Sequence, residues 1–288
     1  MNIEKYRHAK KQDIHLPEYD TNQNDGKSEK ELKEKTIPER VSKLKELHWK
    51  LFAEGKKGIV VVLQAMDAAG KDEAISYIFS NLNAQGLKTT SFQKPTDEEL
   101  NHDYLWRIRE GLPERGQIGI LNRSYYEDVI APRVHDLLDG ETLPDETDKD
   151  LVWSMRYRQI NDFERYMTEN GFAVIKFFFN MSKEEQRKRL LERMKNPKKN
   201  WEFSFQDVEE RKYWESYQDI FEDMLENTST EYAPWYILPA DSEWYSRYII
   251  TEVMIECLEN LDPKFPEISQ ENQEKLDHYI EKLEKEGE

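Results

Sequence analysis

The residues best suited to catalysis lie directly after a short apolar run, Gly58-Ile-Val-Val-Val-Leu63. Small residues follow that run, then Gly70-Lys71 and a segment with the apolar spacing of a helix. Where a strand turns tightly into a helix, backbone N–H groups and the helix N-terminus converge on one anion, and a lysine can reach forward to neutralise it. This arrangement predicts a phosphate site at Ala68, Ala69, Gly70, Lys71 and Asp72.

The match to the P-loop, or Walker A, pattern is imperfect. That pattern has Gly where Ala65 stands, and Ser or Thr where Asp72 stands. The missing hydroxyl is a metal ligand, and the carboxylate of Asp67 is suited to replace it as a ligand of Mg²⁺ beside a transferring phosphoryl group. The alternative interpretation is a chance Gly-Lys pair at the start of a helix.

A second group of polar residues follows the predicted strand 117–121. Strand ends in an open parallel sheet face the ligand crevice, so these residues are placed for chemistry. Guanidinium groups fork onto phosphate oxygens, and carboxylates hold metals. The alternatives are acids that cap or flank the next helix and arginines in structural ion pairs. The candidates are Asn122, Arg123, Glu127, Asp128 and Arg133.

A third group is a basic stretch in an acidic chain. Residues 183–199 hold eight basic and three acidic residues, although the whole chain has 42 Lys and Arg against 59 Asp and Glu, a net charge of −17. Arg189 and Arg193 are four residues apart and share a helix face, and Lys199 follows them. A docked phosphate would respond to this local charge, because salt screens the rest within about 8 Å. The alternative is a solvated, charged helix.

The elements that must position these groups alternate along the chain. Five short apolar segments predict strands at about 58–65, 88–93, 117–121, 172–179 and 234–239, with helical patterns between them. Alternation of this kind is typical of an α/β protein with a parallel sheet. We expect a polar N-terminal arm at 1–35, one domain at 36–262, and an acidic C-terminal helix or tail at 263–288.

Composition excludes several classes of protein. The negative net charge argues against unspecific binding to nucleic acid or anionic membranes. No apolar run approaches the ~18 residues that span a bilayer, and the first residues lack the apolar core of a secretory signal. The single Cys257 cannot form a disulfide within the chain. We therefore expect a cytoplasmic protein without a nucleic-acid or membrane partner.

In this order, the three groups resemble the family-2 polyphosphate kinases. The matching stretches are Asp67–Lys71, Asn122–Val129 with Arg133-Val-His135, and Arg189–Ser204, with further similarity up to Asp241. The resemblance implies a P-loop kinase-like three-layer α/β/α fold, with a five-stranded parallel sheet and a helical lid at about 182–215. It also implies a Mg²⁺-dependent enzyme that moves phosphoryl groups between inorganic polyphosphate and adenine or guanine nucleotides. Family members commonly associate, so a homo-oligomer is expected.

The resemblance also implies roles for individual residues. Asp67 positions the metal and the acceptor, Lys71 and Arg123 bind phosphate, and Glu127 is a second metal carboxylate. Other residues would contact nucleotide or polyphosphate: Ala68, Ala69, Gly70, Asp72, Asn122, Asp128, Arg133, Arg189, Arg193 and Lys199. Many members have Asp where this chain has Asn122, and the Asn form resembles the subgroup that accepts both AMP and ADP. Two alternatives stay open: an ATP-dependent nucleoside or nucleotide kinase, and a nucleotide-responsive binding protein without turnover.

Overall fold

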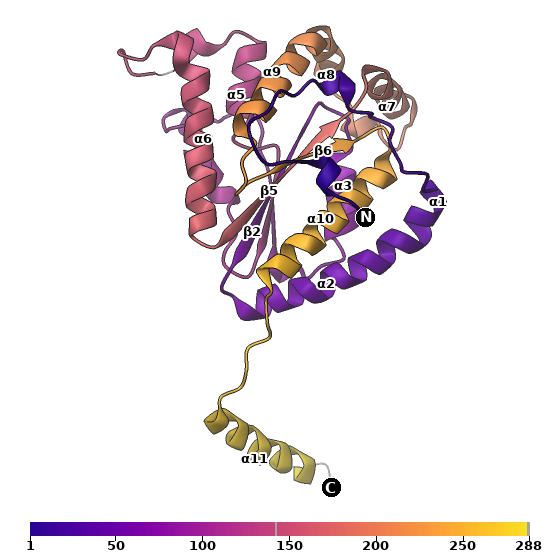
Figure 1. Ribbon diagram of the computed structural model, residues 1–288, viewed down its shortest axis with the longest axis vertical. Helices are drawn as coiled ribbons and strands as arrows, with labels where there is room; N and C mark the ends of the chain where they lie inside the picture. The colour runs from indigo at the N-terminus through magenta and orange to yellow at the C-terminus, as the bar shows by residue number, and fades with distance from the viewer. Residues whose placement is uncertain (142, 287–288) are drawn as a thin grey trace.

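The computed structural model describes residues 1–141 and 143–286, which form one six-stranded sheet with helices on both faces (Figure 1). Residues 287 and 288, the end of the predicted C-terminal helix or tail, lie outside the described residues. The strands lie in the order β1-β6-β5-β2-β4-β3. Their bounds are Arg7–His8 (β1), Gly58–Ala65 (β2), Leu87–Ser91 (β3), Ile118–Asn122 (β4), Phe172–Asn180 (β5) and Trp235–Pro239 (β6).

The sheet confirms the predicted α/β class, and the five expected strands are parallel to one another. Every residue of β2 is buried, as its near-continuous apolar run indicated, because helices cover both faces. The predicted count of five strands was wrong by one. The two-residue β1 pairs antiparallel with β6, Arg7 opposite Tyr236, and is too short to give a periodic signal in the sequence.

Helices cover the two faces of the sheet in separate groups. On one face, α10 packs against β5, β6, α2 and α3; on the other, α6 packs against β5, and α5 and α9 pack beside it. The long helix α2 ends at Gly55, which adopts a left-handed φ of 62° that glycine takes without strain. The bounds are Glu29–Glu31 (α1), Ile37–Glu54 (α2), Lys71–Phe79 (α3), Asp97–Leu100 (α4), Glu127–Val134 (α5), Val152–Glu169 (α6), Lys183–Lys195 (α7), Phe205–Glu209 (α8), Trp214–Thr228 (α9), Glu243–Leu261 (α10) and Gln270–Glu286 (α11).

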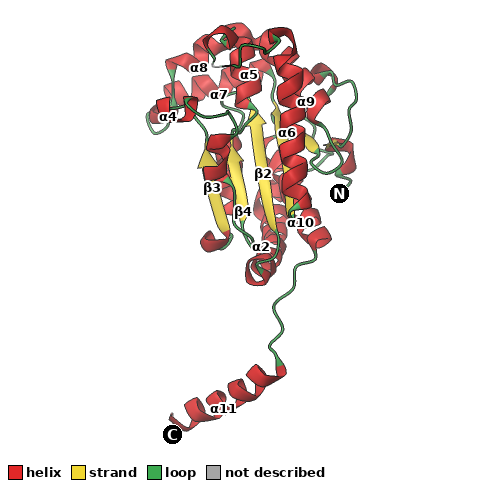
Figure 2. Cartoon of the chain, turned by 90° about the vertical axis from the view of Figure 1, so that its left-hand side faces the viewer, coloured by secondary structure: helices red, strands yellow, loops and turns green. Residues whose placement is uncertain are grey.

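The carboxyl ends of the parallel strands gather at one end of the domain. Figure 2 shows β2, β3 and β4 running toward the end where α4, α5, α7 and α8 lie. The central strand β2 lies between β4 and β5. The strand order reverses at β2, because β3 and β4 lie on one side of it and β5 and β6 on the other. In open α/β sheets, ligands bind outside the carboxyl ends at such a point. The fold therefore directs all three predicted groups toward one end of the sheet.

The N-terminal segment packs more tightly than its polar composition indicated. We expected an arm with little core of its own, but Ile3, Tyr6 and Leu16 are buried against the domain. The hydroxyl of Tyr245 in α10 donates to Asp25, with 2.5 Å between the oxygens. Isolated apolar residues that dock on a distant surface carry no periodicity, so the sequence pattern missed them.

The arm also reaches the base of α7. The Thr21 hydroxyl donates to Asp241 just after β6, with 2.8 Å between the oxygens. The other carboxylate oxygen of Asp241 accepts a hydrogen bond from the Ser182 amide at 2.9 Å. Since Ser182 caps α7, the N-terminal segment, the end of β6 and the start of α7 are joined through one carboxylate.

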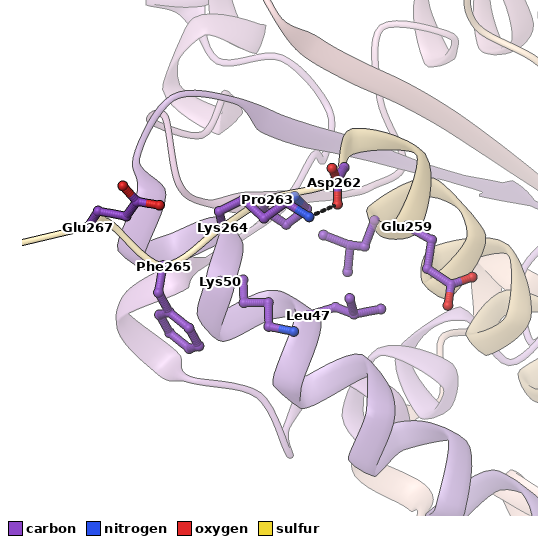
Figure 3. Close-up of a pocket in the computed structure, with 9 residues that line it drawn as sticks. Leu47, Lys50, Glu259, Asp262, Pro263, Lys264, Phe265 and Glu267 are labelled. Atoms are coloured by element: carbon purple, nitrogen blue, oxygen red, sulfur yellow. Dashed lines mark hydrogen bonds and ion pairs between the residues drawn. The ribbon is translucent and has the colours of Figure 1, made fainter.

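The C-terminal helix α11 stands away from the domain on an extended linker (Figures 1 and 2). Next to the start of that linker is a shallow pocket of about 550 Å³, lined by the ends of α2 and α10 and by Pro263, Lys264 and Phe265 (Figure 3). The Lys57 ammonium, just before β2, donates to the Leu261 carbonyl at 3.0 Å, which places this region at the amino end of the strands. The pocket therefore lies at the opposite end of the sheet from the predicted site.

Candidate functional site

The first loop lies between β2 and α3. Ala68 and Gly70 both have left-handed backbone conformations, with φ of 66° and 94°. Only glycine adopts such a φ without strain, and strained loop residues of this kind are typical of functional sites. Helix α3 begins at Lys71, so its free backbone N–H groups face the loop. The predicted succession of strand, tight turn and helix is therefore present.

Lys71 lies folded over this loop. Its side chain is 6% exposed, and the ammonium donates to the Met66 carbonyl at 3.3 Å. Burial lowers the pKa of Lys71, and the neighbouring Arg123 cation lowers it further. A phosphate bound in the loop would raise the pKa of Lys71 again, because it places negative charge beside a poorly hydrated ammonium.

The second loop begins at the end of β4, beside the end of β2. Asn122 pairs in register with Leu63, and the Arg123 amide donates to the Leu63 carbonyl at 3.1 Å. Arg123 also has a left-handed φ, 60°. Its guanidinium pairs with the carboxylate of Asp67 and lies 3.5 Å from that of Glu127. Three residues predicted from two separate segments therefore form one charged cluster.

Carboxylate and amide oxygens gather beside this cluster. The Asn122 amide donates to Asp72 at 2.6 Å, and the Gln64 amide donates to Glu127 at 2.5 Å. The carbonyl oxygens of both amide side chains are buried and have no hydrogen-bond partner in the described part of the chain. Buried acceptors of this kind normally find a partner, and they are ligands that Mg²⁺ accepts.

The donor set at this site fits a magnesium ion. Mg²⁺ usually takes one or two protein carboxylates and completes its octahedron with water and substrate phosphates. Asp67 and Glu127 provide the carboxylates, and Asn122 provides an unpartnered oxygen. Within residues 1–141 and 143–286, no group of three His, Cys, Asp or Glu side chains is arranged around a ready-made metal site. An ion bound here would therefore depend on phosphate oxygens for the rest of its ligands.

Helix α7 contributes two of the predicted cations. The Arg189 guanidinium donates to the carbonyls of Ala68 in the first loop and Ala240 after β6, at 3.3 and 2.7 Å. Arg193 lies one helical turn further on, 3.7 Å from the Glu73 carboxylate of α3. Ser182 caps the N-terminus of α7, which fixes the direction of both arginines. The helical face predicted from their spacing therefore covers the first loop.

Three of the predicted residues form their contacts outside the charged cluster. Lys199 is 45% exposed and pairs with Glu192 at 2.8 Å. Asp128 lies within α5, where burial raises its pKa to about 6 although it pairs with Arg107 at 2.9 Å. Arg133 donates to Asp223 of α9 at 2.6 Å. Asp128 and Arg133 therefore join helical segments to one another through structural ion pairs.

The family model for polyphosphate kinase 2 matches residues 27–266. The chain belongs to that family. The match includes both loops, α7 and the last parallel strand, and thus every residue that contributes to the charged cluster. Membership accords with a site built on fixed cations and carboxylates around a phosphate loop.

Named family relatives cover most of the chain. It is 44% identical over 228 residues to an AMP/ADP-polyphosphate phosphotransferase of Meiothermus ruber, which covers 79% of this chain and 80% of the relative. It is 44% identical to an ADP-polyphosphate phosphotransferase of Rhodopseudomonas palustris over 84% of this chain and 83% of the relative. The crystal structure of polyphosphate kinase 2 from Arthrobacter aurescens superposes with a TM-score of 0.83 at 36% identity, covering 91% of this chain and 92% of that one. The sequence comparisons thus agree on the family, and the structural comparison agrees on the fold.

Sequence reasoning missed some residues that surround the site in this member of the family. The Gln186 amide donates to the Asp67 carbonyl at 3.1 Å, and Gln64 contacts Glu127. Asp207 of α8 has a pKa raised by burial and, next, by the Asp67 carboxylate, so it lies near the cluster. Gln64 had a usable signal, since it is the first polar residue after a buried run. Asp207 had none, because its approach depends on where the short helix α8 packs in the tertiary structure.

Proposed function

We propose that the protein catalyses Mg²⁺-dependent transfer of a phosphoryl group from inorganic polyphosphate to AMP and ADP, forming ADP and ATP. The observation that supports this most directly is the gathering of Lys71, Arg123 and Arg189, from three separate segments, around one small-residue loop. The activities named for the relatives from Meiothermus ruber and Rhodopseudomonas palustris support the same reaction. The assay also includes guanine nucleotides, the further acceptors that the family resemblance implies.

The reaction needs charge compensation more than a base. The second pKa of a terminal phosphate lies near ~6, so the attacking oxygen is already anionic at neutral pH. Two polyanions must approach in line, and the protein contributes mostly positioning and fixed positive charge. Lys71 and Arg123 would hold the transferring group, while Arg189 and Arg193 would hold the phosphates on either side.

Carboxylates keep these cations in place before substrate arrives. Arg123 pairs with Asp67 and Glu127. Incoming phosphate oxygens would replace those carboxylates on the guanidinium, which leaves Asp67 and Glu127 available as ligands. Bound there with the Asn122 oxygen, Mg²⁺ would supply neutralisation of phosphate charge.

The lid, about residues 182–215, would limit access of water. Its helix α7 bonds to the first loop through Arg189 and Gln186, and α8 brings Asp207 close to Asp67. Exclusion of water favours transfer to a nucleotide over hydrolysis. Within the limits 36–262, the lid belongs to the catalytic domain, flanked by the arm at 1–35 and the C-terminal segment at 263–288.

The decisive assay supplies purified protein with Mg²⁺, long-chain polyphosphate and, in parallel, AMP, ADP, GMP or GDP. We expect nucleotide phosphorylation with polyphosphate as donor, and its loss when EDTA removes the metal. Activity with ATP as the only donor would instead identify a nucleotide kinase. A folded, metal-replete protein that binds nucleotide, seen as a rise in Tm, without any transfer would contradict the proposal.

Asp67→Asn tests the metal and acceptor role assigned to that carboxylate. We expect kcat to fall about 100-fold, equivalent to about 2.7 kcal/mol of lost transition-state stabilisation. The remaining activity should also need more Mg²⁺ for half-saturation. Asp139→Asn is the matched control, since Asp139 also pairs with a cation, Lys149, but lies at the surface. Equal effects of the two substitutions would remove the assignment.

Assembly and location are further proposals. No helix in the described residues has both the length and the apolar character of a membrane span. Cys257 is a free cysteine, which suits the reducing cytoplasm where adenine nucleotides are phosphorylated. We propose a homo-oligomer in that compartment, and light scattering of the purified protein would test the oligomer directly.

A further inference from the structure

A fully buried charged cluster lies beneath the second loop. Lys176 is in the middle of β5, in register with Val62 of β2 and Trp235 of β6, and its side chain has no exposed surface. Its ammonium donates to Glu164 of α6 with 2.6 Å between nitrogen and oxygen. A lysine inside an apolar parallel strand is rare, and neither residue takes part in the chemistry described above.

Every polar group in this cluster has a partner. The Lys176 ammonium also donates to the Thr228 carbonyl at 2.7 Å and to the Tyr126 hydroxyl at 3.1 Å, which uses its three protons. One oxygen of Glu164 accepts hydrogen bonds from the hydroxyls of both Tyr125 and Tyr126, each at 2.8 Å. Fully satisfied buried networks of this kind fix a single arrangement of the groups they join.

The two tyrosines belong to the catalytic turn. They lie between Arg123, which has a left-handed φ of 60°, and Glu127. A non-glycine residue keeps such a conformation only where its surroundings determine it. Tyr125 and Tyr126 are 1% and 0% exposed, so their rings and hydroxyls anchor the turn in the interior of the domain.

A buried ion pair is a weak source of stability, because apolar residues of similar volume stabilise a core about as well. We propose that Glu164 and Lys176 are positioning residues, which hold the Arg123–Glu127 turn through the hydroxyls of Tyr125 and Tyr126. This inference rests on the proposed function, since it assigns the turn a task in phosphoryl transfer. Misplacement of a catalytic group by about 1 Å costs about 100-fold in rate, so a loosened turn should lower kcat strongly.

The test removes the hydroxyls and keeps the rings, the ion pair and the catalytic residues. In Tyr125→Phe/Tyr126→Phe we expect kcat to fall at least about 10-fold, with the KM values for nucleotide and polyphosphate within about twofold of wild type. Without substrate, amide hydrogen exchange should rise in peptides covering 119–128. Tyr236→Phe is the control, because Tyr236 is also buried, on β6, and lies outside this cluster.

The apolar variant Glu164→Leu/Lys176→Met separates positioning from stability. We expect it to fold and to show the same selective loss of kcat and the same faster exchange at 119–128. If the double tyrosine variant does not fold, Tyr126→Phe alone provides the same two measurements. Unchanged exchange and unchanged kcat per folded molecule would overturn the proposal, and so would an equal effect of Tyr236→Phe. If wild-type protein transfers no phosphoryl group, the proposed function fails, while the exchange measurement still tests whether the cluster holds the turn.

Discussion

Lys71→Met is the sharpest test of the phosphate loop. Methionine keeps an unbranched apolar stem in a pocket where the lysine side chain is only 6% exposed, and it removes the charge. Helix α3 and the loop backbone should therefore remain folded. The variant isolates what the ammonium contributes to the transition state.

The expected loss follows from the position of the ammonium. A cation about 4 Å from a phosphate oxygen contributes about 4 kcal/mol at an effective dielectric constant of about 20. Removal of one preorganised donor in other enzymes costs about 2.7–4 kcal/mol, or about 100- to 1000-fold in kcat. Burial lowers the pKa of Lys71, so a bound phosphate would favour the charged form of its side chain. We therefore expect a loss of about 100-fold or more.

The assay measures ATP formed from ADP and polyphosphate at saturating Mg²⁺, with thermal unfolding to verify the fold. Lys57→Met is the matched control. Lys57 also donates to a backbone carbonyl, that of Leu261 at 3.0 Å, but at the amino end of β2. If Lys71→Met retains more than about a tenth of wild-type kcat, or if Lys57→Met is equally impaired, the Lys71 ammonium does not stabilise the transferring phosphate.

Two further predictions concern the lid and a buried acid. Arg189→Lys cannot bond to the carbonyls of both Ala68 and Ala240, so the KM for polyphosphate should rise about 10-fold, whereas Arg187→Lys on the exposed face should change little. Burial raises the pKa of Asp128 to about 6 in the folded protein, whereas the pKa of Asp in an unfolded chain is about 3.9. Between these two pH values the folded protein binds a proton at Asp128 that the unfolded chain has lost. The free energy of unfolding of wild type, relative to Asp128→Asn, should therefore fall by up to about 3 kcal/mol as pH rises from 4 to 7 in urea titrations.

Each of these predictions has a contradicting result. An unchanged KM in Arg189→Lys would mean that α7 does not need both carbonyl contacts to bind polyphosphate. A stability difference between wild type and Asp128→Asn that is flat, or that rises with pH, would mean that the pairing of Asp128 with Arg107 outweighs burial.

The local parts of the site could be predicted from the sequence. The strand β2, the turn at Gly70 and the helix beginning at Lys71 are contiguous, and each has its own composition and spacing. The same holds for Arg189 and Arg193, since helical periodicity alone places them on one face. What these segments share is that the interactions defining them lie within about 20 residues.

The partners of isolated charged residues could not be predicted. Arg133 and Asp128 looked equivalent to Arg123 and Glu127 in the sequence, and all four flank or lie in α5. The helix turns the first pair toward α6, α9 and Arg107, and leaves the second pair at the end of β4. A guanidinium suits a carboxylate as well as a phosphate, so the choice depends on tertiary packing that no local pattern encodes.

The link between the first residues and the end of β6 has a consequence for folding during synthesis. Tyr245 bonds to Asp25, and Asp241 to Thr21, each across 220 residues of chain. Contacts between such distant positions form slowly, because a long loop must close before they contribute. On the ribosome, Thr21 and Asp25 therefore cannot form these bonds until the last parallel strand and the residues after it have emerged. Until then Asp241, whose carboxylate accepts the hydrogen bond from Ser182 at the start of α7, is also missing. A nascent chain that has already formed the phosphate loop would therefore still lack the contact that fixes α7 beside it.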